Sequence, residues 1–297
     1  MRVPTDMPRP QRRPLSRVGL GVTAVVLFFI ITSLRTIAVF YTDYLWFKEV
    51  GFSDVWRTTL LTKVGLSVAF TAVFFVLMFL NLAIGERLAP KFRPFGAEDE
   101  IVERYREIVG PHAGKLRVAV ALLFALIAGL GASSQYDEWI LFRNSADFGA
   151  EDPQFGRDIG FFVIRLPFLI YTAQWAFVAL VIVLIVTAAA HYLNGGIRVN
   201  APLGRVTPQV KAHLSVLLGV IALVRAAGYF LQRFELSFSN RGVVAGAGYT
   251  DVNARLPATN LLIGISVFSA LLFLFNIRQR GWRLPGIAIG LWALVSV

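Results

Sequence analysis

Seven apolar stretches divide this chain, and the first six approach or reach the length of a membrane-spanning helix. A hydrocarbon layer of about 30 Å requires roughly 20 apolar residues per helix, and a helix satisfies its own backbone hydrogen bonds in lipid. The sequence therefore predicts an all-α fold, a polytopic transmembrane helical bundle of about seven spans. The predicted spans are Val18 to Phe40, Val64 to Ile84, Leu116 to Ala132, Leu166 to Ala190, Val210 to Leu231, Ala258 to Asn276, and Leu284 to the end of the chain.

The seventh apolar stretch is shorter than the others, because only 14 residues remain from Leu284 onward. We expect this span to be truncated and more chain to follow it. The composition agrees with a membrane domain, since 56% of the residues are hydrophobic, 16% are charged and the mean hydropathy is +0.65. That balance excludes a soluble enzyme. The chain has no cysteine, which excludes disulfides, thiolate metal sites and cysteine nucleophiles.

Lysine and arginine follow the predicted topology and do not form one patch. The tail of residues 1–17 and the loops at 85–117, 191–211 and 277–283 together hold 18 of them, whereas the three alternate loops hold nine. Cytoplasmic loops carry the excess of positive charge in membrane proteins. We therefore expect a multi-pass protein of the cell membrane with a cytoplasmic N-terminus, and an extracytoplasmic chain beyond the seventh span. The net charge of +11 indicates topology and contact with membrane lipids, and no nucleic acid is expected as a partner.

Four parts make up the predicted organisation: a basic cytoplasmic tail over 1–17, a transmembrane helical domain over 18–297, an amphipathic cytoplasmic helix near 98–109, and an outer loop over 133–165. The helix near 98–109 either docks a partner protein or lies on the membrane, since an amphipathic stripe must be buried somewhere. The outer loop and the first loop are rich in aromatic residues, which are favoured at a membrane interface. Protein partners are expected at the outer face or at the helix near 98–109, and the oligomeric state stays open.

Three sequence segments carry a resemblance to a known family. They are YTDYLWFKEVGF after the first span, DPQFGRDIGFFVIRLPF before the fourth, and GYTDVNARLPA before the sixth. With these motifs the chain resembles the large bacterial integral membrane proteins grouped as uncharacterised protein family 0182, and the resemblance covers essentially the whole chain. It implies a multi-span membrane domain followed by a much larger extracytoplasmic region. It implies no biochemical activity.

Two arginines, Arg35 and Arg225, are the ionisable residues deepest in the predicted spans. Charged residues inside membrane segments are candidates for function. Both are predicted in the outer third of the bilayer, where a long side chain can reach the headgroups or pair with a carboxylate such as Asp43 or Glu235. The alternative is a site for an anion or a lipid headgroup. In that case Tyr229 and Gln232 would assist Arg225 from the same helical face. The candidate substrate or lipid contacts are Arg35, Arg225, Tyr229 and Gln232.

Other candidate sites have plainer explanations. The three histidines, His112, His191 and His213, are far apart in sequence and lack cysteine partners, so we expect no metal site. The six acids of the outer loop show no calcium-loop spacing, and solvation explains them equally well. Small residues recur every four positions and predict close helix packing within the bundle, or alternatively a dimer seam. These small residues are Ala121, Ala125 and Gly129 in the third span and Gly286 and Gly290 in the seventh.

Two functions remain open from the sequence. One is a membrane domain that anchors a large extracytoplasmic region as an envelope assembly or interaction platform. The other is a transporter or channel for an anionic or lipidic substrate guided by Arg225 and Arg35. No Asp or Glu lies in the interior of a predicted span, which weakens a proton-coupled transporter. The sequence has no Ser/His/Asp set, HExxH motif or P-loop, so we expect neither enzyme activity nor a cofactor.

Overall fold

The fold is helical throughout the part of the chain that the structure, a computed structural model, describes. This part comprises residues 17–90, 104, 107, 109–198, 205–240 and 246–296. Within it there is no strand, only two isolated bridges between loop residues. Six helices are long and apolar enough to cross a membrane. The prediction of an all-α polytopic membrane bundle is therefore confirmed. The predicted tail, apart from Arg17, and nearly all of the helix near 98–109 lie outside the described residues.

The long helices are joined by short 3₁₀ and π segments. The α-helices of the described residues are α1 (Arg17–Glu49), α2 (Ser53–Arg87), α4 (Ala113–Leu130), α5 (Tyr136–Arg143), α6 (Leu166–Leu193), α7 (Pro208–Gln232), α8 (Leu256–Gln279) and α9 (Arg283–Ser296). The short segments are η1 (Gly110–His112), η2 (Gly131–Gln135), η3 (Phe161–Arg165), η4 (Phe234–Phe238) and η5 (Asp251–Arg255). The predicted seventh span corresponds to α9, an apolar helix shorter than the six candidate spans.

The chain forms two compact units, Met1–Leu61 and Thr62–Val297. In the first unit, the prediction of a long loop between the first two spans is wrong, because α1 continues to Glu49 and α2 begins at Ser53. The turn between them is closed by the N–H of Phe52, which donates to the carbonyl of Phe47 at 2.9 Å. The polar and aromatic residues after Phe40 do not break a helix, since they include neither glycine nor proline before the turn.

In the second unit, α2, α4, α6 and α7 share one apolar core. Ala121 and Ala125 of α4 are fully buried in it. Gly129 lies so close to α2 that an added Cβ atom would stand 2.5 Å from the backbone nitrogen of Thr71. Packing within the bundle, predicted from this small-residue spacing, is thus confirmed for α4. The prediction does not extend to α9, since a Cβ atom at Gly286 or Gly290 would meet nothing within 4 Å.

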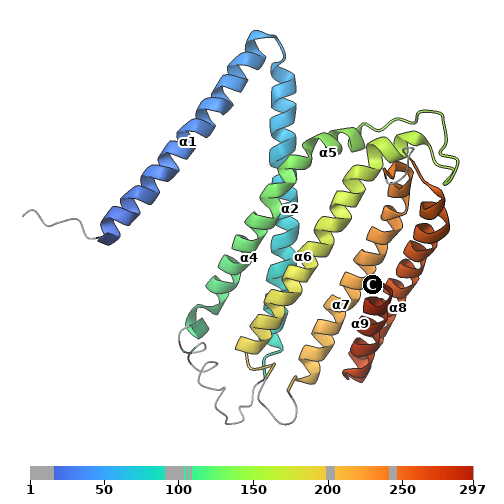
Figure 1. The fold of residues 1–297 in the computed structure, drawn as a ribbon. Helices are drawn as coiled ribbons and strands as arrows, with labels where there is room; N and C mark the ends of the chain where they lie inside the picture. The colour runs from blue at the N-terminus through green and yellow to red at the C-terminus, as the bar shows by residue number, and fades with distance from the viewer. Residues whose placement is uncertain are drawn as a thin grey trace, which may run out of the picture. The chain divides into compact units, whose positions relative to one another are not determined.

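The last four helices pack in chain order, as Figure 1 shows: α7 lies between α6 and α8, and α8 contacts α9. Polar side chains link neighbouring helices inside this layer. The Asn276 side chain on α8 donates to the Ser215 hydroxyl on α7 at 2.8 Å, and the Ser269 hydroxyl on α8 donates to the Ala288 carbonyl on α9 at 3.3 Å. Such bonds between helices satisfy polar groups that lipid cannot satisfy.

Helices α6 and α8 begin in the same way. Each follows a five-residue π segment that ends in an arginine, Arg165 in η3 and Arg255 in η5, and each opens with Leu-Pro. Proline in the first turn of a helix removes no hydrogen bond that the helix would have made. The span starts predicted at Leu166 and Ala258 are therefore confirmed to within two residues. Arg165 lies 3.7 Å from Asp147 in the preceding loop, and Arg255 pairs with Asp251, the first residue of η5, at 2.9 Å.

Candidate functional site

A cavity of about 210 Å³ lies between α6, α7, α8 and α9, within the second unit. We call it the Arg225 cavity. Its walls are almost entirely apolar, and the polar side chains that reach it are Arg225, Ser266 and Ser269. The apolar lining residues are Phe177, Leu218, Ile221, Ala222, Phe273, Ala288, Ile289 and Trp292.

The guanidinium of Arg225 is held by aromatic rings. Its central carbon lies 4.1 Å from the ring centre of Tyr229, one turn later on α7, and 5.2 Å from that of Phe177 on α6. A guanidinium is attracted to the face of an aromatic ring in such contacts. The Nε atom of Arg225 is buried and has no hydrogen-bond partner among the described residues. No carboxylate of the described residues forms an ion pair with Arg225, so the predicted pairing with Glu235 is not formed.

The Ser266 hydroxyl is the second polar group of the Arg225 cavity without a partner. Ser266 is 1% exposed, and its Oγ finds no hydrogen-bond partner among the described residues. A buried hydroxyl without a partner costs about 1–3 kcal/mol, so native structures rarely leave one unmatched. By contrast, Ser269 is satisfied by its bond to α9. The cavity therefore combines an apolar wall with one cation and one hydroxyl that the described residues do not satisfy.

The structure brings together only part of the predicted contact set. Tyr229 contacts Arg225 as its spacing predicted, whereas Gln232 does not line the cavity. Arg35 is exposed on α1, which belongs to the first unit. Its predicted role as a substrate or lipid contact stays a prediction. The sequence did not indicate Phe177, Ser266 or Trp292, because these residues come from helices that only the packing places beside α7.

A second polar site inside the bundle consists of Asn81 on α2, His191 on α6 and His213 on α7. We call it the His cluster. Nε2 of His191 lies 3.0 Å from Nδ1 of His213, and Nε2 of His213 lies 3.0 Å from Oδ1 of Asn81. An amide oxygen only accepts, so Nε2 of His213 carries a hydrogen, and in the neutral ring Nδ1 then accepts from Nε2–H of His191. The amide group of Asn81 donates in turn to the carbonyl of Leu77 at 2.7 Å.

The sequence did not indicate the His cluster, because the histidines are far apart along the chain. His191 is fully buried and His213 is 8% exposed, whereas His112 is exposed. No group of three or more His, Cys, Asp or Glu residues within the described ranges is arranged to hold a metal ion. The cluster is thus a chain of hydrogen bonds that links α2, α6 and α7. The only signal for it in the sequence was the presence of a polar residue in each of three apolar helices.

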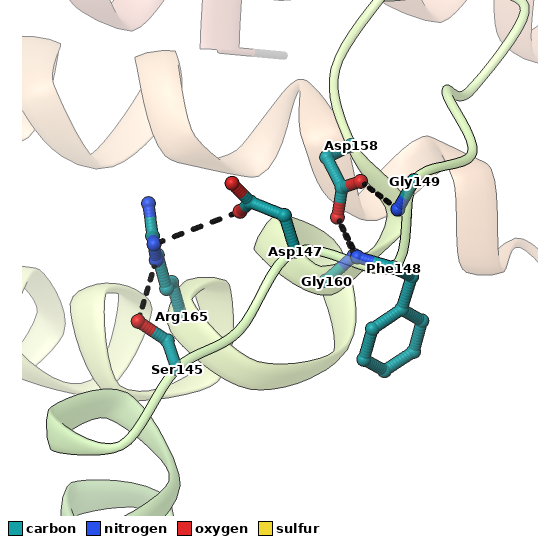
Figure 2. Close-up of polar contacts among 7 residues, drawn as sticks. All are labelled: Ser145, Asp147, Phe148, Gly149, Asp158, Gly160 and Arg165. Atoms are coloured by element: carbon teal, nitrogen blue, oxygen red, sulfur yellow. Dashed lines mark hydrogen bonds and ion pairs between the residues drawn. The ribbon is translucent and has the colours of Figure 1, made fainter.

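The outer loop of 133–165 is an ordered structure that contains α5 and η3, and Figure 2 shows its main polar contacts. The carboxylate of Asp158 accepts three backbone N–H bonds, from Phe148 at 2.9 Å, Gly149 at 2.8 Å and Gly160 at 2.6 Å. Arg165 donates to the Ser145 hydroxyl at 2.8 Å and lies 3.7 Å from Asp147. These contacts fold the loop back on itself.

Three of the six acids of this loop, Asp147, Asp152 and Asp158, have structural partners. The N–H of Phe148, together with those of Gly160 and Gly149, holds the pKa of the Asp158 carboxyl below its usual range. Asp152 accepts from the backbone of Gln154 and Phe155 and from the hydroxyl of Ser237. The loop is thereby joined to η4, where Phe234 packs in one buried cluster with Phe162 and Leu166.

Comparison with known proteins finds one family. Residues 20–297 match the model of an uncharacterised protein family, UPF0182. The UPF0182 protein of Frankia alni is 45% identical over 255 residues, which cover 86% of this chain and 25% of that protein. The UPF0182 proteins of Frankia casuarinae and Nocardioides sp. are 42% and 41% identical, each over 98% of this chain and 29% of the relative. The chain thus spans between a quarter and a third of the length of these curated relatives. No solved structure matches it.

Proposed function

This chain belongs to the uncharacterised protein family UPF0182, and from that premise we propose that it is a membrane domain that anchors a large extracytoplasmic region. The observation that carries the proposal is the alternation of charge across the helices. Of the 29 lysines and arginines, 18 lie on the tail and the three loops predicted to be cytoplasmic, and nine lie on the alternate loops. The excess of positive charge supports a cytoplasmic N-terminus. We infer a seventh crossing that begins with α9, and the region that follows it would then emerge outside.

The outer face of the second unit supports a role as an assembly or interaction platform. The loop of 133–165 and η4 are joined by the bond from Ser237 to Asp152, and Arg157 lies over the rings of Phe161 and Phe234. A surface held by such contacts requires little ordering when a partner binds, and the conformational cost of binding is correspondingly low. A following extracytoplasmic region or a second envelope protein would therefore meet a surface that is already formed.

Reporter fusions in the full-length gene test the orientation. A periplasmic phosphatase inserted after Asn144 is expected to be active, and the same phosphatase inserted after Gly195 is expected to be inactive. Protease added to spheroplasts is expected to remove the region that follows Val297 and to leave an epitope at the N-terminus intact. The reverse pattern of activity, or a C-terminal region protected from protease in intact spheroplasts, would contradict the proposal.

A second candidate function is supported by the Arg225 cavity: a transporter or channel for an anionic or lipidic substrate. Its apolar wall favours a lipidic substrate over a small hydrated anion, because a hydrated ion needs polar partners along its path. Cells that carry Arg225→Leu in the full-length gene should then show the deletion phenotype at normal protein level. A wild-type phenotype for this variant would leave the anchor as the better explanation.

A further inference from the structure

The size and lining of the Arg225 cavity call for an apolar occupant. Its volume of about 210 Å³ exceeds the roughly 150 Å³ of an engineered, enclosed apolar cavity that stays dry and binds benzene, and the Arg225 cavity is in addition partly open to its surroundings. Atoms that line an empty void lose their dispersion contacts on that side. Water finds few polar partners in this space, since only Arg225, Ser266 and Ser269 reach it and a water molecule needs two to four. At the depth of membrane-spanning helices the abundant apolar molecules are the acyl chains of lipids.

The charge of Arg225 indicates that the occupant also carries an anionic group. Arg225 is half-buried in a membrane-spanning helix and has no carboxylate partner among the described residues. A cation in this setting is stabilised by an anion. The aromatic rings of Tyr229 and Phe177 restrict the guanidinium, which presents a planar set of donors suited to phosphate or carboxylate. The group that completes the site is therefore anionic.

The buried hydroxyl of Ser266 is an independent indication of a ligand. It lies in the wall of the same cavity, 1% exposed and without a partner among the described residues. An ester carbonyl next to an acyl chain is an acceptor of the kind this hydroxyl lacks. The apolar wall, the unpaired cation and the unmatched hydroxyl together describe the surroundings of a glycerolipid: a chain, an ester and an anionic headgroup.

The order of these groups along the helices matches the order within a lipid. Arg225 lies seven residues before the end of α7 and Leu218 lies seven residues before Arg225, so each interval corresponds to about 10 Å of helix. Phe273 on α8 lies seven residues beyond Ser266 in the direction away from the helix start. The cavity therefore begins with a cation and continues with apolar side chains.

We propose that the Arg225 cavity binds one anionic phospholipid of the surrounding membrane, with its phosphate at Arg225, an ester at Ser266 and part of one acyl chain along α7 and α8. Such a resident lipid is independent of whether the domain only anchors or also transports. It stabilises the contacts among α6, α7, α8 and α9. It also makes the second unit sensitive to the content of anionic lipid in the membrane.

The test uses the full-length protein, purified, delipidated and titrated with phosphatidylglycerol or phosphatidylcholine in native mass spectrometry. Wild type should retain one phosphatidylglycerol at least tenfold more tightly than phosphatidylcholine. Arg225→Leu should remove this preference. The matched control is Arg233→Leu, since Arg233 also stacks on aromatic rings but does not line the cavity. Ala222→Leu keeps the arginine and fills the cavity, so it should weaken binding of both lipids.

Several outcomes would overturn the proposal. Equal binding of the two lipids by wild type, or an unchanged preference in Arg225→Leu, would contradict a contact between Arg225 and an anionic headgroup. Lipid binding by Ala222→Leu that is as tight as that of wild type would show that the acyl chain does not occupy the cavity. Displacement of the lipid by inorganic phosphate would reduce the site to an anion site, whereas displacement by oleate would support the chain and the anion together. Absence of any bound lipid in the wild-type full-length protein would show that the cavity binds no phospholipid.

Discussion

The His cluster and the Arg225 cavity both lie between α6 and α7, yet they differ in how far their polar atoms are joined by hydrogen bonds. In the His cluster the contacts run from His191 through His213 to Asn81 and then to a backbone carbonyl, and one buried nitrogen, Nδ1 of His191, has no partner among the described residues. In the Arg225 cavity a guanidinium nitrogen and a hydroxyl have no partner among the described residues. A buried polar group that is satisfied within the protein contributes to stability, whereas one left unmatched is available to a ligand. The His cluster links three helices and does not line the Arg225 cavity, whereas the unmatched groups of Arg225 and Ser266 lie at this same cavity.

The largest effect is expected from breaking the His cluster. His213→Leu leaves Oδ1 of the half-buried Asn81 and Nε2 of the buried His191 without their partners, which should lower the free energy of unfolding by about 2–4 kcal/mol. The midpoint of thermal unfolding of the purified protein in detergent measures the change. His112→Leu is the control, because His112 is exposed. Similar midpoints for the two variants would show that the cluster does not hold the helices together.

A smaller loss of stability should distinguish substitutions at two arginines of the bundle, Arg117 and Arg225. Arg117 on α4 forms an ion pair with Glu86 on α2, whereas Arg225 has no such partner in the described part of the chain. In delipidated protein, Arg117→Leu should cost about 1 kcal/mol, after allowance for solvent around Glu86. Arg225→Leu should cost less than Arg117→Leu, since the two lost ring contacts, each worth about 0.5–1 kcal/mol, are offset by removal of a buried guanidinium nitrogen that has no partner among the described residues. If Arg225→Leu proves the more damaging change in the same thermal assay, the cavity is a structural site.

The smallest effect is expected at Asp158, a closed site outside the membrane-spanning helices. Its pKa lies below the ordinary value of 3.8, chiefly because the N–H of Phe148 and those of Gly160 and Gly149 bond to the carboxylate. The stabilisation that the ionised carboxylate provides is therefore fully present above the pKa that Asp158 has in the unfolded chain. It is lost as the pH falls through the lower pKa of Asp158 in the folded protein. Hydrogen exchange at the amides of Phe148 and Gly149 should become faster, relative to the intrinsic rate, only below about pH 4.

Asp158→Asn should remove most of this pH dependence and leave the two amides less protected at neutral pH. The matched control is Asp147→Asn, because Asp147 is an exposed acid of the same loop whose contact is an ion pair with Arg165 at 3.7 Å. Protection that is unchanged between pH 3 and pH 7 in wild type would show that the carboxylate does not organise the loop.

The helices could be predicted from the sequence more closely than the connections between them. The starts of α6, α7 and α8 lie within two residues of the predicted spans, because proline in the first turn and the Thr207 cap mark them locally. The Thr207 hydroxyl accepts from the N–H of Val210 at 3.4 Å, as a capping residue does. The end of α1 was predicted nine residues too early, since polar residues such as Thr42 and Asp43 end an apolar run without ending a helix.

The candidate sites could be predicted only where the contact is local. Tyr229 is one helical turn from Arg225, and spacing was enough to place the two together. His213 is 22 residues from His191 and 132 from Asn81, so no local pattern connects them. Ser266 and Phe177 meet at the cavity because three helices pack side by side. Such contacts depend on crossing geometry and side-chain volume, which the order of residues alone does not reveal.

The two π segments also set the angular phase of the helices that follow them. A π turn contains one residue more than the α-helical turn that it replaces. Phe177 follows Arg165 by 12 residues and Ser266 follows Arg255 by 11, so the direction of each side chain depends on that extra residue. Loss of one residue from η3 or η5 would turn the helix behind it by about 100°. The identity of the cavity wall is thus encoded more than three helical turns away, in two short segments at the start of α6 and α8.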